Sequence, residues 1–172
     1  DNSSSHGGAM LISYSDPVID HSLFYENDSP FGGGIYVSNY STPEFVNCTF
    51  SENTSTYGGA FYCSDLGGQP TITNCILWDD VCSYNYEIFA TSSYYAPIVT
   101  YTDVENGSGQ NWFGIGCIDT DPIFTDPTND DFTLQGISPC INAGDPSSPL
   151  DPDGTIADMG AFYFEETQVT QQ

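Results

Sequence analysis

The sequence has no lysine and no arginine among its 172 residues, whereas it has 24 aspartates and glutamates. Average proteins place basic residues at roughly a tenth of their positions, so complete absence over this length is not a sampling accident. The formal net charge of −24 repels anions, and the chain has no guanidinium or ammonium side chain to bind phosphate. Nucleic acids and anionic membrane surfaces are therefore excluded as partners, and polyanionic sugars are disfavoured.

The missing basic residues have two interpretations. A segment without Lys or Arg is one that a trypsin-like protease leaves intact, so cleavage at basic residues could have delimited the chain. The alternative, which we favour, is the composition of an acidic surface protein exposed to salt or acid. The chain begins at Asp1 rather than Met, so we expect a mature or trimmed product. It has no apolar run long enough to insert into a membrane.

Sequence motifs for familiar chemistry are also absent. There is no G-x-S-x-G, no H-E-x-x-H and no phosphate loop, and His6 and His21 have no catalytic companions nearby in the sequence. Inverting glycoside hydrolysis needs only carboxylates, and four lie near the ends of neighbouring repeat units: Asp79, Asp80, Asp103 and Glu105. Because carboxylates are abundant throughout this chain, their availability discriminates little, and we expect a protein that is not an enzyme.

A repeat of 26 or 27 residues organises the first part of the chain. It is marked by Pro17, Pro43, Pro70 and Pro97. Seven residues after each proline stands an apolar residue: Phe24, Phe50, Leu77 and Val104. The intervening positions alternate between apolar and polar, as in a β-strand. A unit of this length is too short for a strand, a helix and loops. We therefore predict an all-β solenoid of about four coils over residues 1–106, with parallel strands and that apolar column in its interior.

A second strand of each coil shows which side chains face outward. The runs GGAMLIS, GGGIYVS and GGAFYCS align with a degenerate copy, NYEIFAT. Burying an unpaired carboxylate is costly, so the column of Glu87 should face outward or lie at a bend. The strand period then places one column inside, Met10, Ile35, Phe61 and Ile88, and the next outside, Leu11, Tyr36, Tyr62 and Phe89. We predict a binding surface formed by Tyr36, Tyr62, Phe89, Tyr94 and Tyr95.

Polar residues also form columns at a predicted turn. One column consists of His21, Asn47, Asn74 and Tyr101. Stacked asparagine amides pass hydrogen bonds along the axis and satisfy the turn backbone. Cys48 and Cys75 stack beside them, but parallel side chains hold the Cβ atoms too far apart for good disulfide geometry. We therefore predict a ladder of small core residues there rather than a covalent bond.

The remaining cysteines and the glycosylation sequons favour an oxidising exterior. Six cysteines without a C-x-x-C pair do not have zinc-site spacing. Cys117 could pair with Cys140, and Cys63 with Cys82, although spacing does not determine the connectivity. Six N-x-S/T sequons occur, at Asn2, Asn27, Asn39, Asn47, Asn53 and Asn106. These features predict an extracellular or cell-surface protein.

The repeat stops after Asn106, and residues 107–172 form a second region that is rich in acids. Calcium prefers oxygen-rich loops, and in the run DPDGTIAD several oxygens could converge on one ion. The candidate ligands are Asp151, Asp153, Asp158 and Thr155, with a weaker set at Asp119, Asp121 and Asp126. The alternative is that the Asp-Pro and Asp-Gly pairs simply make turns.

Three segments of this region, DPIF, DFTLQGISPCINAGDP and DPDGTIADMGAFYF, follow coils such as GGAFYCS and PTITNCILW. Together they resemble the right-handed parallel β-helix proteins of microbial surfaces and secretions. The resemblance covers essentially the whole chain, and it implies that residues 107–172 close the C-terminal end of the solenoid. This fold hosts lyases, hydrolases and adhesins alike, so it defines no activity. Its polyuronate lyases are expected to need calcium and a basic side chain, and this chain has no Lys or Arg.

The ends of the predicted solenoid suggest how it assembles. No capping helix precedes the coil at residues 7–13, and the tail at 165–172 is prone to form β-structure. Exposed β edges invite strand addition or head-to-tail stacking, unless further coils precede this segment. We therefore predict a structural or adhesive module that self-associates in a surface filament or sheath. The alternatives are a carbohydrate-binding module, with aromatic rings stacked on glycans, and a carboxylate-only glycoside hydrolase.

Overall fold

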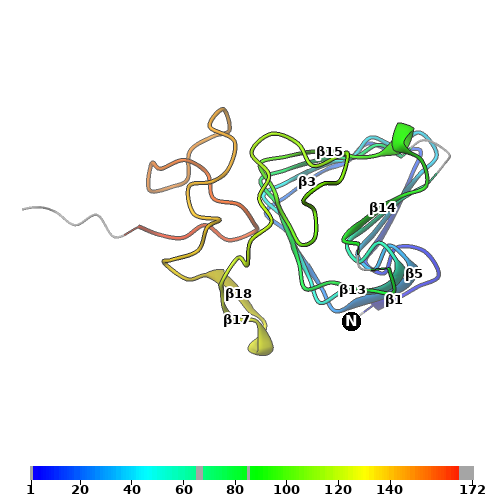
Figure 1. The fold of residues 1–172 in the computed structure, drawn as a ribbon, viewed down its shortest axis with the longest axis horizontal. Helices are drawn as coiled ribbons and strands as arrows, with labels where there is room; N and C mark the ends of the chain where they lie inside the picture. The colour runs from blue at the N-terminus through cyan, green and yellow to red at the C-terminus, as the bar shows by residue number, and fades with distance from the viewer. Residues whose placement is uncertain (1, 65–67, 85, 167–172) are drawn as a thin grey trace, which may run out of the picture.

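A computed structural model describes residues 2–64, 68–84 and 86–166 of the chain. The coils stack so that each contributes one strand to each of four parallel sheets, and Figure 1 looks along the stack. Sheet A contains β1 (Asn2–Ser3), β5 (Asn27–Phe31), β9 (Thr54–Tyr57) and β13 (Val81–Cys82). Sheet B contains β2 (Met10–Ser13), β6 (Ile35–Ser38), β10 (Phe61–Cys63) and β14 (Ile88–Ala90). Sheet C contains β3 (Val18–Asp20), β7 (Glu44–Val46), β11 (Thr71–Thr73) and β15 (Ile98–Thr100). Sheet D contains β4 (Leu23–Tyr25), β8 (Thr49–Ser51), β12 (Ile76–Trp78) and β16 (Asp103–Val104).

The interior file predicted from the proline spacing is present. Phe24, Phe50, Leu77 and Val104 are direct register partners along sheet D. The last three are fully buried, and Phe24 in the first coil stacks on Phe50 with ring centroids 4.7 Å apart. The all-β parallel solenoid of about four coils is therefore confirmed. Strands β1 to β4 occupy the outer position of each sheet.

Sheet B has the predicted facing. Ile35, Phe61 and Ile88 are buried, while the outward neighbour of Met10, Leu11, is 53% exposed. The column of Glu87 lies at a bend before each strand, which was one of the two expected positions. Glu87 is nevertheless only 5% exposed. The expectation that its carboxylate would avoid burial is wrong, and one of its oxygens accepts the Asp80 N–H there.

The turn column of asparagines is also confirmed. Its four members, His21, Asn47, Asn74 and Tyr101, all have positive φ, between 41° and 53°. Asparagine tolerates this left-handed conformation better than most residues. The Asn74 amide donates to the Asn47 amide oxygen at 3.4 Å, so hydrogen bonds run along the axis as expected.

The C-terminal region lies in two places. Residues 107–118 continue on the last coil, where Val99 bridges to Phe113 and Asp103 to Ile118. Residues 119–166, which we call the cap, lie beside the coil stack (Figure 1). Their only named strands, among the described residues, are the antiparallel pair β17 (Phe124–Asp126) and β18 (Asp131–Leu134). A short 3-10 helix, η2 (Pro127–Asn129), joins them, and a second, η1 (Ser93–Tyr95), precedes β15.

The cap was expected to close the end of the solenoid, but it packs along the side. The Gly160 N–H donates to the Asn74 carbonyl at 2.8 Å, and the Ala161 N–H donates to the Thr49 hydroxyl at 2.9 Å. Beneath these bonds is a second core, whose buried members are Ile76, Phe124, Phe132, Leu134, Cys140 and Met159. The turn column of asparagines binds the cap on two successive coils, since the Asn47 amide donates to the Asp158 carbonyl at 2.8 Å and Asn74 Oδ1 accepts the Asp145 N–H at 2.7 Å. Residues 167–172 of the predicted β-prone tail lie outside the described residues.

The disulfide predictions are wrong, because all six cysteines are free thiols. Cys63 lies inside sheet B, where burial raises its pKa to about 12. Cys140 donates instead to the Asp103 carboxylate, with 3.2 Å between sulfur and oxygen. The predicted ladder of small residues is confirmed, since the Cys48 N–H donates to the Cys75 sulfur at 3.4 Å. The thiols therefore serve as small core residues.

Candidate functional site

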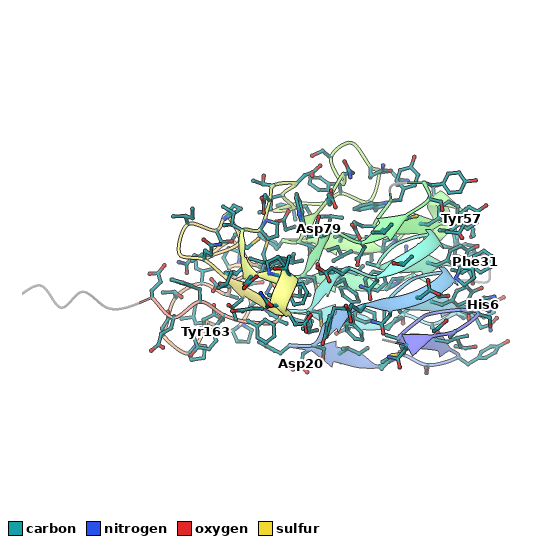
Figure 2. The ribbon with its side chains drawn as sticks, turned by 90° about the horizontal axis from the view of Figure 1, so that it is seen from below. His6, Asp20, Phe31, Tyr57, Asp79 and Tyr163 are labelled. Atoms are coloured by element: carbon teal, nitrogen blue, oxygen red, sulfur yellow. The ribbon has the colours of Figure 1, made fainter. Side chains whose placement is uncertain are left out.

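Two columns of rings run along the outside of the coils, and we call them together the aromatic corner. The corner consists of His6, Phe31, Tyr57, Tyr84, Tyr36, Tyr62 and Phe89. In the first column the centroids of Tyr36 and Tyr62 are 5.1 Å apart, and those of Tyr62 and Phe89 are 5.5 Å apart. The second column stacks Phe31 on Tyr57 at 5.7 Å and Tyr57 on Tyr84 at 5.0 Å. Figure 2 shows His6, Phe31 and Tyr57 along one edge of the stack.

The two columns of the aromatic corner also contact each other. Rings meet edge to face between Phe31 and Tyr62, and between Tyr57 and Phe89, each pair at 5.2 Å. A shallow hollow of about 420 Å³ lies over them, lined by those four residues and Thr91. The rings therefore stack face to face along each column, and the two columns contact each other edge to face.

The predicted binding residues are only partly brought together. Tyr36, Tyr62 and Phe89 belong to the aromatic corner. Tyr94 and Tyr95 lie on η1 and contact each other edge to face at 5.2 Å. Tyr94 is highly exposed, but it is not one of the corner rings. The second column was not predicted from the sequence, although Phe31 and Tyr57 occupy equivalent positions of the repeat, each directly before a glycine.

A separate pocket lies beside the last coil. It has a volume of about 280 Å³, and its lining includes Phe89, Trp112, Ser93, Gln110 and Asn111. Aromatic rings beside amide and hydroxyl groups are a chemistry suited to small polar ligands. The pocket begins at the last ring of the Tyr36 column.

A ladder of amides ends at a carboxylate in sheet A. Asn2 donates to Asn27 at 3.0 Å, Asn27 donates to Asn53 at 2.8 Å, and Asn53 donates to Asp80 Oδ1 at 2.8 Å. The same Asp80 oxygen accepts the Asn53 N–H at 2.7 Å. These residues stand 25, 26 and 27 positions apart, so they occupy one column of the repeat. The ladder therefore ends at the carboxylate of Asp80, which is at a buried position in the third coil.

Asp80 meets Glu87 at this position, forming what we call the carboxyl pair. Glu87 Oε1 accepts the Asp80 N–H at 3.3 Å, and the two carboxyls hydrogen-bond to each other when one of them holds a proton. Burial raises the pKa of Asp80 to about 7. Burial, followed by the Asp80 charge, raises the pKa of Glu87 well above its ordinary value. The packing is tight, since a Cβ added at Gly59 would lie 2.6 Å from that of Asp80.

The carboxyl pair opens into a pocket of about 230 Å³ whose lining includes Asp79, Asp80, Glu87, Glu105 and Asn106. Three of the four carboxylates considered for hydrolysis therefore meet here. Glu87 was missed, because its column otherwise contains small residues. A glycosidase pair stands about 5 Å or more apart, leaving room for the sugar and a water molecule. A pair in direct hydrogen-bonding contact leaves no such room.

Asp103 is the fourth carboxylate, and it lies elsewhere. It is buried between sheet D and the cap, where it accepts from the Cys140 thiol and from the Thr120 N–H at 3.2 Å. Burial raises the pKa of Asp103 to about 7. Its contacts hold the cap against the last coil.

The predicted calcium ligands of the cap serve as acceptors for backbone groups. Asp158 accepts the N–H groups of Asn142 and Phe164, each at 2.6 Å. Asp153 accepts those of Thr155 at 3.0 Å and Glu166 at 3.1 Å, and Asp151 accepts that of Asp158 at 2.8 Å. These bonds agree with the alternative that the acids make turns.

The weaker calcium set behaves in the same way. Asp119 accepts the N–H groups of Asn106 and Ser108, and Asp121 accepts that of Ile123. Asp126 accepts the Thr128 hydroxyl and the Asn129 amide. Across the described part of the chain, no three acidic, histidine or cysteine side chains already surround a common point as metal ligands.

Four of the sequon asparagines are engaged in the ladders. Asn27, Asn47 and Asn53 are buried, and the Asn2 amide donates to Asn27. A glycan has no room on the three buried amides in the folded coils. Asn39, which donates to the Ser13 hydroxyl, and Asn106 lie nearer the surface. Asn2 is exposed as well, so Asn2, Asn39 and Asn106 remain as candidates on geometric grounds.

The parallel sheets and the interior file define a β-solenoid, a class of protein whose repeats form a continuous core. Residues 1–111 match a family described as "Right handed beta helix region". The match spans more than half of the chain, so the chain belongs to the right-handed β-helix family. Searches among curated proteins and among solved structures gave no match. Within the described residues, no helix has the length and apolar character needed to cross a membrane.

Proposed function

We propose that this chain is an extracellular structural module that associates side to side with other copies through its aromatic corner. The observation that carries the proposal is the pair of stacked ring columns. These rings, most of them half-buried, form a strip that crosses successive coils, and aromatic strips of this kind mark interaction surfaces. The aromatic corner is the surface that we assign to the self-association predicted from the sequence.

The stacking of the rings favours this proposal over binding of sugars at the corner. A sugar ring packs on an exposed aromatic face. In the corner each inner face already contacts the ring of the next coil, at 5.0 to 5.7 Å between centroids. Ring edges and tyrosine hydroxyls are what a partner meets. These groups suit flat contact with a second apolar strip.

Charge explains why the contact would form at this corner. Two copies that each carry −24 repel one another across most of their surfaces. The residues that line the hollow over the corner are aromatic, apart from Thr91, and none of them is a carboxylate. Salt screens the remaining repulsion over about 10 Å at 0.1 M. We therefore expect association to strengthen with ionic strength.

The test is sedimentation of the protein at several concentrations in 0.5 M NaCl. The triple variant Tyr36→Thr, Tyr62→Thr, Phe89→Thr keeps strand-forming residues but removes one ring column. We expect oligomers from the wild type and monomers from the variant. The matched control, Val18→Thr with Ile98→Thr, removes exposed apolar groups from sheet C and should still associate. Wild-type protein that stays monomeric, or a control that loses association equally, would contradict the proposal.

A second candidate function rests on the pocket beside the last coil. Trp112 and Phe89 line it with Gln110, Asn111 and Ser93, which suits a sugar better than the corner does. Binding on a glycan array that Trp112→Ala abolishes, and that Tyr36→Thr leaves intact, would favour a carbohydrate-binding module. The head-to-tail and strand-addition modes of assembly stay predictions, as does the cell-surface location.

A further inference from the structure

The carboxyl pair contains two buried oxygens that accept no hydrogen bond from an amide, hydroxyl or thiol group. They are Asp80 Oδ2 and Glu87 Oε2. The other two oxygens are occupied, since Asp80 Oδ1 accepts twice from Asn53 and Glu87 Oε1 accepts the Asp80 N–H. Glu87 is 5% exposed and both residues line the pocket that also contains Glu105. These two oxygens are thus buried beside one small acidic pocket, with no donor group of the chain to compensate them.

Nothing in the chain's own composition can neutralise these oxygens. A buried carboxylate is strongly unfavourable unless it is paired with a positive charge or a proton. The sequence has no Lys and no Arg, and His6 and His21 lie in the first coil. Whatever neutralises these oxygens, a cation or a proton, must therefore come from solution.

We propose that the Asp80–Glu87 carboxyl pair is a binding site for one divalent cation of the calcium class, with Glu105 and Asn106 at the mouth of the pocket supplying further oxygens. Calcium takes six to eight oxygen ligands in flexible geometry, often including waters. Glu105 Oε2 already accepts the Asp79 N–H at 3.0 Å, so Glu105 contributes its other oxygen and waters complete the shell. Cys82 also lines the pocket, but its thiol donates to the Thr56 carbonyl at 3.2 Å, which disfavours metals that prefer sulfur.

A proton competes with the cation for the same oxygens. Burial raises the pKa of both carboxyls, so in acid the pair holds a proton instead. The titratable groups facing the pair are Asp79, Glu105 and the Cys82 thiol. The negative charges of Asp79 and Glu105 favour binding of a cation and of a proton alike. We therefore expect calcium affinity to fall at least tenfold between pH 8 and pH 5.5.

The experiment is calorimetric titration of calcium chloride into the full chain at pH 8, in metal-free buffer with 0.15 M NaCl. We expect one site per chain and a rise in melting temperature that added NaCl of equal ionic strength does not reproduce. Glu87→Gln and Asp80→Asn keep the occupied acceptor oxygens and should abolish both effects. Circular dichroism verifies that each variant is folded.

The matched controls lie in the cap. Asp153→Asn and Asp158→Asn remove carboxylates of the other predicted calcium site and should leave the titration unchanged. A calcium response that survives Glu87→Gln, or that only the cap variants abolish, would overturn the proposal. It would also be overturned if calcium has no effect beyond ionic strength while Glu87→Gln raises the melting temperature at pH 8, because the pair would then hold a proton only.

Discussion

The coil stack and the cap satisfy their backbone groups in different ways. In the coils each strand pairs in register with the equivalent strand of the next coil, and side chains stack in the same columns. The cap has one short strand pair among its described residues, and carboxylates take the place of strand partners there. Asp158 and Asp153 each accept two N–H groups. The comparison shows how this chain uses acids where periodic pairing ends.

The largest expected effect distinguishes the core of the coils from the core beneath the cap. Phe50 is fully buried in the coil core, with its ring 4.7 Å from those of Phe24 and Phe61. Phe50→Ala should cost about 3–5 kcal/mol in the free energy of unfolding, measured with urea. Phe132→Ala removes a ring of the same size from the cap core. We expect this control to lose hydrogen-exchange protection in the cap and to keep it in sheets B and C. Loss of protection throughout both regions would show that they unfold as one unit.

The next effect is a pH dependence that comes from the coils and from the interface with the cap. Folding raises the pKa of Asp80 and Asp103 to about 7 and raises that of Glu87 as well. The folded state thus binds more protons than the unfolded state between about pH 4 and pH 7. The stabilisation that these three carboxyls contribute is therefore fully present below about pH 4. It is lost as the pH rises to about 7, which lowers the free energy of unfolding by on the order of 2–4 kcal/mol.

Urea unfolding in metal-free buffer at pH 4 and pH 8 measures this dependence. Glu87→Gln replaces an ionisable group by a neutral amide of similar shape, so its stability should change less between the two conditions. The exposed Asp28→Asn is the control, and it should keep the wild-type slope. A wild type that gains stability as the pH rises would contradict the assignment.

The amide ladder gives a smaller effect, located in the coils. Asn53→Ala removes a fully buried side chain that donates to Asp80 and to the Phe24 carbonyl and accepts from Asn27. Buried groups left without partners should lower the free energy of unfolding by about 2–3 kcal/mol. Asn111→Ala, at an exposed position, should change it by less than about 0.5 kcal/mol. Equal effects in urea unfolding would mean that the ladder does not stabilise the stack.

Most of the coil architecture could be predicted because one sequence period fixes it. A column such as Phe24, Phe50, Leu77 and Val104 repeats the same physical constraint four times, so the interior file and the outward facing of Tyr36 followed from the pattern. The same period contained the amide ladder. It was missed because Asn27 and Asn53 were interpreted as sequons rather than as a column.

The cap and the carboxyl pair could not be predicted, because their contacts are not periodic. The facing of Glu87 was predicted from the cost of burying a lone carboxylate. The sequence does not show that Glu87 contacts Asp80, seven residues earlier. The disulfide predictions were wrong for a similar reason. Cys140 lies beside Asp103, a contact between residues 37 positions apart that only the three-dimensional packing of the cap creates.

The smallest expected effect tests the role of acids in the cap. Asp158→Asn replaces one of two acceptor oxygens by an NH₂ group, which then faces the N–H of Asn142 or Phe164. We expect a loss of about 1–2 kcal/mol, confined to the cap, and faster hydrogen exchange at the amide that loses its acceptor. Asp145→Asn is the control, since its carboxylate caps only the local turn at Ser147. If exchange also accelerates in sheet B, the carboxylates of the cap support the coils too, and the two regions are not independent.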